Sequence, residues 1–434
     1  MSRDSAANCN IIKRFLLNDN NAKRNGFIWN MLGSTLNAFQ SVILLMILTR
    51  TVGLAQAGVY TIAYANANLF LYLGNYGMRN FQVSDVRPKY SFREYIISRA
   101  ISVTAMLLLA FVFIMVSACQ NNYSIDKTWI MIWMVIQKAI DSIENVFHGQ
   151  YQRNERLDVA GRCMTIRMAI LIVSFGVAVI ISRNLLEGLI ISTLITFVVF
   201  LVFTLWTNNQ STNSSSKDFS WNSLMMLMWH CLPLCLGAFL SYYIGNAPKY
   251  AIDAILTSEE QACYGFIAMP VFVIGLLNNY IFMPQLHSLS LLWKDQNIRG
   301  FKRSIFKQTG IIASITVVCM LGAFLVGIPV LSLIYNTNLT EYRDPLVVLL
   351  LGGGFLAFTG YLSAVITIIR YQKYMLIGYT VVSLIAMVMS NRIVSVYGVM
   401  GASLFYTVLL AGLSVVFILT LVLGMTNSKS RIIS

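Results

Sequence analysis

The sequence predicts an all-α polytopic membrane protein with about twelve transmembrane helices. Of its 434 residues, 57% are hydrophobic and only 11% are charged, whereas a soluble domain has about 25% charged residues. Apolar runs of about 20 residues, which is the length a helix needs to cross a bilayer, recur along the chain. Basic residues gather in alternate connections between these runs, as they do on the cytoplasmic side of membrane proteins.

The apolar runs give the expected membrane spans. In chain order they cover residues 27–49, 55–77, 97–118, 128–149, 163–182, 188–206, 224–245, 263–284, 305–327, 345–369, 374–391 and 397–424. Residues 1–25 and 425–434 are the predicted terminal tails.

Lysine and arginine residues predict the orientation. If the N-terminus is cytoplasmic, the inner segments contain roughly four times as many basic residues as the outer ones. Arg79, Arg99 and Arg167 count as cytoplasmic in this assignment, and Arg50 and Lys249 count as outer. Both termini are therefore predicted to be cytoplasmic. Topology and anionic lipid headgroups explain the net charge of +14, so we expect the lipid bilayer and no nucleic acid as a partner.

A Ser- and Asn-rich stretch, NNQSTNSSSKDFSWN, separates the first six runs from the last six. Its composition is typical of a flexible linker. We therefore predict two six-helix bundles, an N-lobe over 26–207 and a C-lobe over 224–424, joined by a cytoplasmic linker over 208–223. Three glycines at 352–354 lie near the beginning of the tenth run, and they predict a break in that helix.

The fourth run contains charges that cannot face lipid. Its polar stripe, on one side of a helix with 100° per residue, consists of Gln137, Lys138, Asp141, Glu144, Asn145, His148 and Gln152. Each central charge costs about 2.5–3.5 kcal/mol in the bilayer, so the stripe must face other helices or a watery cavity. Intramembrane ionisable groups mark transport pathways. The alternative is that Lys138 pairs with Asp141, and Glu144 with His148, only to lock helices together.

The residues give little support for a metal site, a disulfide or a catalytic site. The seven cysteines have no paired spacing, and His230 lies beside Cys231 and Cys235 without a nearby carboxylate, so we expect no metal and no disulfide. His148, His230 and His287 belong to no recognisable catalytic motif. The glycines at 352–354 lack the Lys-Ser/Thr of a P-loop. We therefore predict that the chain is not an enzyme and has no cofactor.

Four segments resemble a known family. They are TVGLAQAGVY from Thr51 to Tyr60, NYGMR ending at Arg79, HGQYQRNERLD from His148, and NAPKYAID ending at Asp253. Together they resemble the Wzx-type polysaccharide flippases of the MOP exporter superfamily, over about residues 26 to 424. The resemblance implies a V-shaped pair of six-helix lobes in the bacterial cytoplasmic (inner) membrane. It also implies that alternating access moves undecaprenyl-diphosphate-linked oligosaccharide repeat units from the cytoplasmic to the outer leaflet, for a surface polysaccharide such as capsule.

Such a substrate defines the candidate site. A diphosphate loses its solvation in hydrocarbon, so a central cavity should offer cations to the head and polar side chains to the sugars. The candidate cavity residues are Lys138, Asp141, Glu144, Asn145, His148, Arg50, Arg79, Lys249, Asp253 and Arg370. Arg79 and Arg370 are equally explained as ordinary cytoplasmic residues. Lys249 and Asp253 are four residues apart and could pair.

The polar stripe is net negative, with one lysine and two carboxylates. Asp141 and Glu144 are therefore also candidates to bind a coupling H+ or Na+. The expected partners are the glycosyltransferases that build the glycan and a polysaccharide polymerase. The alternative function is a MATE-like cation-coupled antiporter of drugs or small molecules, which could have the same fold. A membrane enzyme of glycan assembly ranks last, because no catalytic motif is present.

Overall fold

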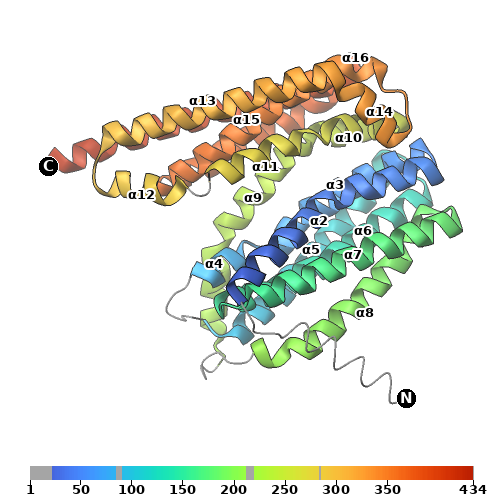
Figure 1. Cartoon of the computed structure of the whole chain (residues 1–434), viewed down its shortest axis with the longest axis horizontal. Coiled ribbons are helices and arrows are strands. Elements are labelled where there is room, and N and C mark those ends of the chain that lie inside the picture. Colours follow the sequence, from blue (N-terminus) through green and yellow to red (C-terminus); the bar gives the residue numbers. More distant parts are fainter. Residues whose placement is uncertain (1–21, 85–89, 212–218, 283–284, 434) are drawn as a thin grey trace. The chain divides into compact units, whose positions relative to one another are not determined.

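The computed structural model describes residues 22–84, 90–211, 219–282 and 285–433. These residues are almost entirely helical, and none of them forms a β-strand (Figure 1). The predicted all-α fold class is therefore confirmed.

The first six predicted spans correspond to six long helices. In chain order the helices are α2 (Ala22–Thr51), α3 (Leu54–Asn75), the short α4 (Met78–Ser84), α5 (Phe92–Gln120), α6 (Ile125–Arg153), α7 (Leu157–Ser182) and α8 (Leu185–Ser211). The short α4 lies between the second and third spans, and the hydrophobic pattern did not predict it. Of the predicted linker, residues 212–218 lie outside the described residues.

The remaining spans are more irregular. The helices are α9 (Trp221–Ile255), α10 (Ser258–Ala268), α11 (Val271–Phe282), α12 (Leu286–Lys294), α13 (Ile298–Gly322), the π-helix η2 (Ala323–Gly327), α14 (Ile328–Tyr335), the 3-10 turn η3 (Thr340–Tyr342), α15 (Arg343–Ile368) and α16 (Gln372–Ile433). The eighth predicted span is thus the pair α10 and α11.

The last two predicted spans both lie in α16. Gly398, with φ 55° and ψ −140°, interrupts the helical conformation there. The chain folds back at this point, since the rings of Tyr379 and Phe417 pack with centroids 5.2 Å apart. A positive φ is readily adopted by glycine. We call the two halves joined at Gly398 the α16 hairpin.

Eight described helices are long and apolar enough to cross a membrane. The other predicted spans correspond to α3, the polar α6, the α10–α11 pair and the second half of α16. The chain is therefore a multi-pass membrane protein with about as many spans as predicted.

The chain divides into two compact units. The first comprises Met1–Gln56 and Ala63–Phe239, and the second comprises Ala57–Ile62 and Leu240–Ser434. The beginning of α3 joins the second unit through a very close approach to α10. A Cβ atom on Gly58 would lie 1.8 Å from the backbone oxygen of Ser258, so only glycine fits there.

Small residues also bring α2 and α7 together in the first unit. A Cβ on Gly161 would lie 2.5 Å from the backbone nitrogen of Asn30. At the same crossing the Thr165 hydroxyl donates to the backbone oxygen of Trp29 at 3.1 Å. Close backbone approach and interhelical hydrogen bonds are the means by which helices associate in lipid.

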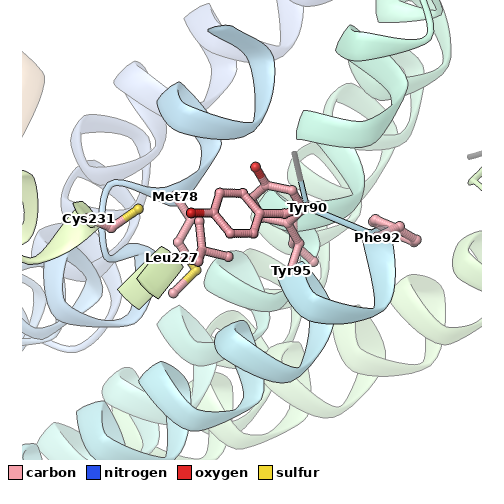
Figure 2. Close-up of a cluster of buried hydrophobic side chains, with 7 residues drawn as sticks. Met78, Tyr90, Phe92, Tyr95, Leu227 and Cys231 are labelled. Carbon is pink, nitrogen blue, oxygen red and sulfur yellow. The ribbon is translucent and has the colours of Figure 1, made fainter. Parts of the chain in front are cut away.

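A hydrophobic cluster packs α4, α5, α6 and the beginning of α9 in the first unit. Figure 2 shows six of its seven residues with labels, and the cluster consists of Met78, Tyr90, Phe92, Tyr95, Val146, Leu227 and Cys231. Cys231 is therefore a buried packing residue. Val146 belongs to α6, so this cluster fixes the helix that contains the polar stripe.

The break expected at residues 352–354 does not occur, and that prediction was wrong. Instead α15 continues from Arg343 to Ile368. A Cβ on Gly352 would lie 2.5 Å from Cδ1 of Tyr406, and one on Gly354 would lie 2.5 Å from the Thr316 side chain. These glycines permit close packing of neighbouring helices inside the second unit.

Candidate functional site in the first unit

The polar stripe of α6 is buried among the helices of the first unit. Helix α6 begins at the N-cap Ser124, whose side chain accepts a hydrogen bond from the Lys127 amide. Farther along, Lys138 is only 2% exposed, and Glu144 and His148 are each 5% exposed. This burial agrees with the argument that the charges cannot face lipid.

Arg167 of α7 joins the two carboxylates of the stripe. Its Nη2 lies 2.7 Å from Oδ1 of Asp141 and 2.7 Å from Oε2 of Glu144. Its Nε donates to the same Glu144 oxygen at 2.9 Å. The guanidinium presents several donors in a fixed plane, which suits a bridge between two carboxylates. Arg167 is 1% exposed, so this bridge lies inside the helix bundle.

Lys138 and His148 complete the network on α6. The Lys138 ammonium donates to Oδ2 of Asp141 at 2.9 Å, on the opposite oxygen from Arg167. It also lies 5.0 Å from the ring centroid of Tyr64 on α3, within the range of a cation–π contact. Nε2 of His148 lies 3.6 Å from Oε1 of Glu144. We call Lys138, Asp141, Glu144, His148 and Arg167 the buried ionic network.

The network is not net negative, contrary to expectation. Arg167 adds a second cation to Lys138, so the two basic groups balance Asp141 and Glu144. Arg167, which was counted as cytoplasmic, is buried within α7, a helix long and apolar enough to span a membrane. Its position within the predicted span 163–182 was the signal that could have identified it as part of the site.

Arg99 of α5 was also counted as cytoplasmic and is also buried in a helix. It is 1% exposed and also falls within a predicted span, 97–118. Its guanidinium donates to the backbone oxygen of Gly74 at 2.5 Å and to the Ser142 hydroxyl at 3.3 Å. It also donates to Oδ1 of Asn145, at 3.3 Å, and so contacts the polar stripe directly.

Arg79 of α4 lies near the end of the stripe. Its Nη2 donates to Oε1 of Gln152 at 3.0 Å. Nearby, the Gln82 amide donates to Oε1 of Gln150 at 3.2 Å. The first unit thus brings Arg79, Arg99 and Arg167 together with the predicted stripe, and the two carboxylates lie among these basic groups.

The other candidate residues are placed elsewhere. Arg50 is exposed in the last turn of α2. Lys249 and Asp253 lie one turn apart on α9, in the part of that helix that belongs to the second unit. Arg370 is exposed in the second unit, just after α15, with a φ of 63°.

The network has one feature that suits anion binding. Asp141 accepts from Lys138 on one oxygen and from Arg167 on the other. Lys138 has a flexible four-carbon stem and three donors. It can therefore exchange Asp141 for another anion, while Arg167 still compensates the buried Asp141 carboxylate. The paired residues also fit the alternative of a structural lock, so geometry alone permits both roles.

The chain is similar to known proteins in sequence and in fold. No family model matches the chain. The chain is 25% identical to the capsular polysaccharide biosynthesis protein CapF of Staphylococcus aureus over 391 residues. The aligned region covers 88% of this chain and 95% of CapF.

Two solved structures show the same fold. The lipid II flippase MurJ in an inward closed conformation matches with a TM-score of 0.69 and 14% identity, over 91% of this chain and 87% of MurJ. An inward-facing MATE-family multidrug resistance transporter of the MOP superfamily matches with a TM-score of 0.65 and 12% identity, over 91% of this chain and 95% of that one.

These relatives confirm the predicted resemblance. The two structural neighbours are named as a flippase and a transporter. The chain is a multi-pass membrane protein that has the fold of MOP-superfamily transporters and is similar in sequence to a capsular polysaccharide biosynthesis protein.

Proposed function

We propose that this protein flips undecaprenyl-diphosphate-linked oligosaccharide repeat units from the cytoplasmic to the outer leaflet of the bacterial cytoplasmic membrane. The similarity to CapF supports a role in surface polysaccharide biosynthesis. The fold shared with MurJ and a MATE transporter supports a membrane transporter. Glycosyltransferases that build the repeat unit and a polymerase that uses it are the partners this function requires.

The single observation on which the proposed mechanism rests is the position of Lys138. Its ammonium is paired with Asp141, yet Asp141 retains Arg167 if Lys138 turns away. In the proposed mechanism Lys138 moves from Asp141 to a diphosphate oxygen, and Arg79, Asn145 and His148 contribute further polar contacts. The second-unit candidates Lys249, Asp253 and Arg370, and Arg50 of the first unit, remain proposed cavity residues.

We further propose that Glu144 or Asp141 binds the coupling ion, H+ or Na+. Protonation of Glu144 would remove the charge that attracts Arg167 and would loosen the contact between α6 and α7. A void of about 10 Å³ lies beside Glu144, His148 and Tyr151. That is about the space one water molecule needs, so a water beside Glu144 is the proposed proton donor.

The test is translocation in proteoliposomes that contain a polyprenyl-diphosphate oligosaccharide. The wild type should deliver the glycan to the outer leaflet, and Lys138→Ala should abolish delivery in protein that remains folded. Transport that survives Lys138→Ala would keep the flippase and return Lys138 to a structural role. Failure of folded wild type with several glycans and ion gradients would overturn the proposed function.

The MATE match favours a second candidate, a cation-coupled antiporter of drugs or small molecules. The two functions differ in their cargo. Expression of an antiporter in a drug-sensitive strain would raise the tolerated drug concentration, whereas expression of a repeat-unit flippase would leave it unchanged. Drug susceptibility therefore separates the two proposals.

A further inference from the structure

The α16 hairpin of the second unit encloses an apolar groove with a volume of about 400 Å³. Its floor is made of Val382, Phe405 and Leu409, which are 3–4% exposed. Its rim includes Tyr397 and Val408, which are 66% and 62% exposed. The floor is thus packed protein and the rim opens to the surroundings of a membrane-spanning helix.

The groove extends along much of the hydrocarbon thickness of a bilayer. On the first arm of the hairpin it is lined from Val382 to Ile393, and on the second arm from Tyr397 to Gly412. These eleven and fifteen residue steps, at 1.5 Å each, extend for about 16 Å and about 22 Å along the two arms. The hydrocarbon core of a bilayer is about 30 Å thick, so the groove covers about half to three quarters of it. One end of the groove adjoins the turn at Gly398, where the hairpin reverses.

The groove also has the volume of a single acyl chain. An engineered apolar cavity of about 150 Å³ binds one benzene, which has six carbon atoms. By proportion, a groove of about 400 Å³ holds about 16 carbons. An undecaprenyl chain contains several times that number, so it would not fit as a whole.

Arg392 is a basic residue near the turn of the hairpin. Arg392 is exposed and precedes the lining residue Ile393. Arg392 therefore lies near the turn that adjoins one end of an otherwise apolar groove. A basic residue near the bilayer surface attracts anionic headgroups by about 1 kcal/mol.

We propose that the α16 groove is a binding site for an anionic phospholipid of the bilayer. One acyl chain lies along the groove, and the phosphate lies at Arg392. The groove length, its volume and the position of the charge all agree with this occupant. Bound lipid would then fill the space between the two arms of the hairpin.

Gly412 gives a direct test, because a Cβ atom added there meets no heavy atom within 4 Å. Gly412→Leu therefore adds an apolar side chain to the groove with no clash at its Cβ atom. Gly310→Leu is the matched control, since Gly310 of α13 is also exposed and also has open space around its Cβ. Arg392→Gln removes the cation, and Val408→Trp covers the groove from its rim if Gly412→Leu does not fold.

The measurement is native mass spectrometry of the full-length protein titrated with dipalmitoyl phosphatidylglycerol or dipalmitoyl phosphatidylcholine. We expect wild type and Gly310→Leu to retain phosphatidylglycerol, with about tenfold weaker binding for Gly412→Leu or Val408→Trp. Arg392→Gln should abolish the preference for phosphatidylglycerol over phosphatidylcholine. Equal binding by wild type and both groove-filling variants would overturn the site. Displacement of phosphatidylglycerol by equimolar undecaprenyl phosphate would overturn the assigned occupant.

Discussion

The guanidinium of Arg167 lies 2.7 Å from a carboxylate oxygen of Glu144, so an ion pair joins α7 to α6 inside the membrane-spanning bundle. Both side chains are almost completely buried. Arg167 also contacts Asp141, and it therefore compensates two carboxylates at once. The other cation of the network, Lys138, compensates only one of them. This asymmetry leads to different predictions for the two basic residues.

Arg167→Leu should destabilise the folded protein strongly. It removes the Arg167 contact from Glu144 and leaves Asp141 with its Lys138 contact, and breaking a buried pair in this way costs about 3–5 kcal/mol. Thermal unfolding in detergent should show a large fall in the melting temperature. Arg167→Lys should recover only part of the loss, because a lysine presents a single charged point. A melting temperature unchanged in Arg167→Leu would contradict the buried bridge.

Lys138→Ala should cost much less stability and much more transport. Asp141 keeps its contact with Arg167 in this variant, so we expect less than half the melting-temperature loss of Arg167→Leu. Glycan translocation should fall at least tenfold. Lys127→Ala is the control, because Lys127 lies over the Tyr123 ring near the beginning of the same helix. If Lys138→Ala loses stability and transport in the same proportion as Arg167→Leu, Lys138 has a structural role only.

The first-unit site shows how far the residues predict the structure. The burial of Lys138 and Glu144 followed from the cost of placing charges in lipid, and it needed only the helical period. Arg99 and Arg167 were missed because a count of basic residues places each charge on one side of the membrane. It does not consider a charge that is neutralised within the span by another helix. Which helices meet depends on close packing, such as that of Gly161 against Asn30, and this is not visible in a single hydrophobic profile.

The second unit shows the same limit. The apolar runs predicted both arms of the α16 hairpin, because length and composition determine membrane insertion. They did not predict the unbroken α15, because glycines 352–354 are equally compatible with a break and with close packing. The Tyr406 ring beside Gly352 decides between these possibilities, and its position depends on the tertiary fold.

Gly58→Ala should disrupt the contact between the beginning of α3 and α10. The added Cβ would lie 1.8 Å from the Ser258 backbone oxygen, and a backbone atom cannot turn aside as a side chain can. We expect a loss of folded protein on size-exclusion chromatography. Gly360→Ala is the matched control, because a Cβ there has open space and alanine favours a helix over glycine by about 1 kcal/mol. Equal yields of the two variants would show that α3 and α10 are not so close.

Glu144→Gln should remove the dependence of transport on an ion gradient, if Glu144 binds the coupling ion. Glutamine keeps the shape and an acceptor oxygen for Arg167 but cannot bind a proton at neutral pH. Translocation should be measured with and without imposed H+ and Na+ gradients. Glu187→Gln is the control, since Glu187 is an exposed carboxylate in the first turn of α8. A gradient dependence that persists in folded Glu144→Gln would exclude Glu144 as the coupling residue. The same measurement on Asp141→Asn would then decide whether the second carboxylate of the Arg167 bridge has that role.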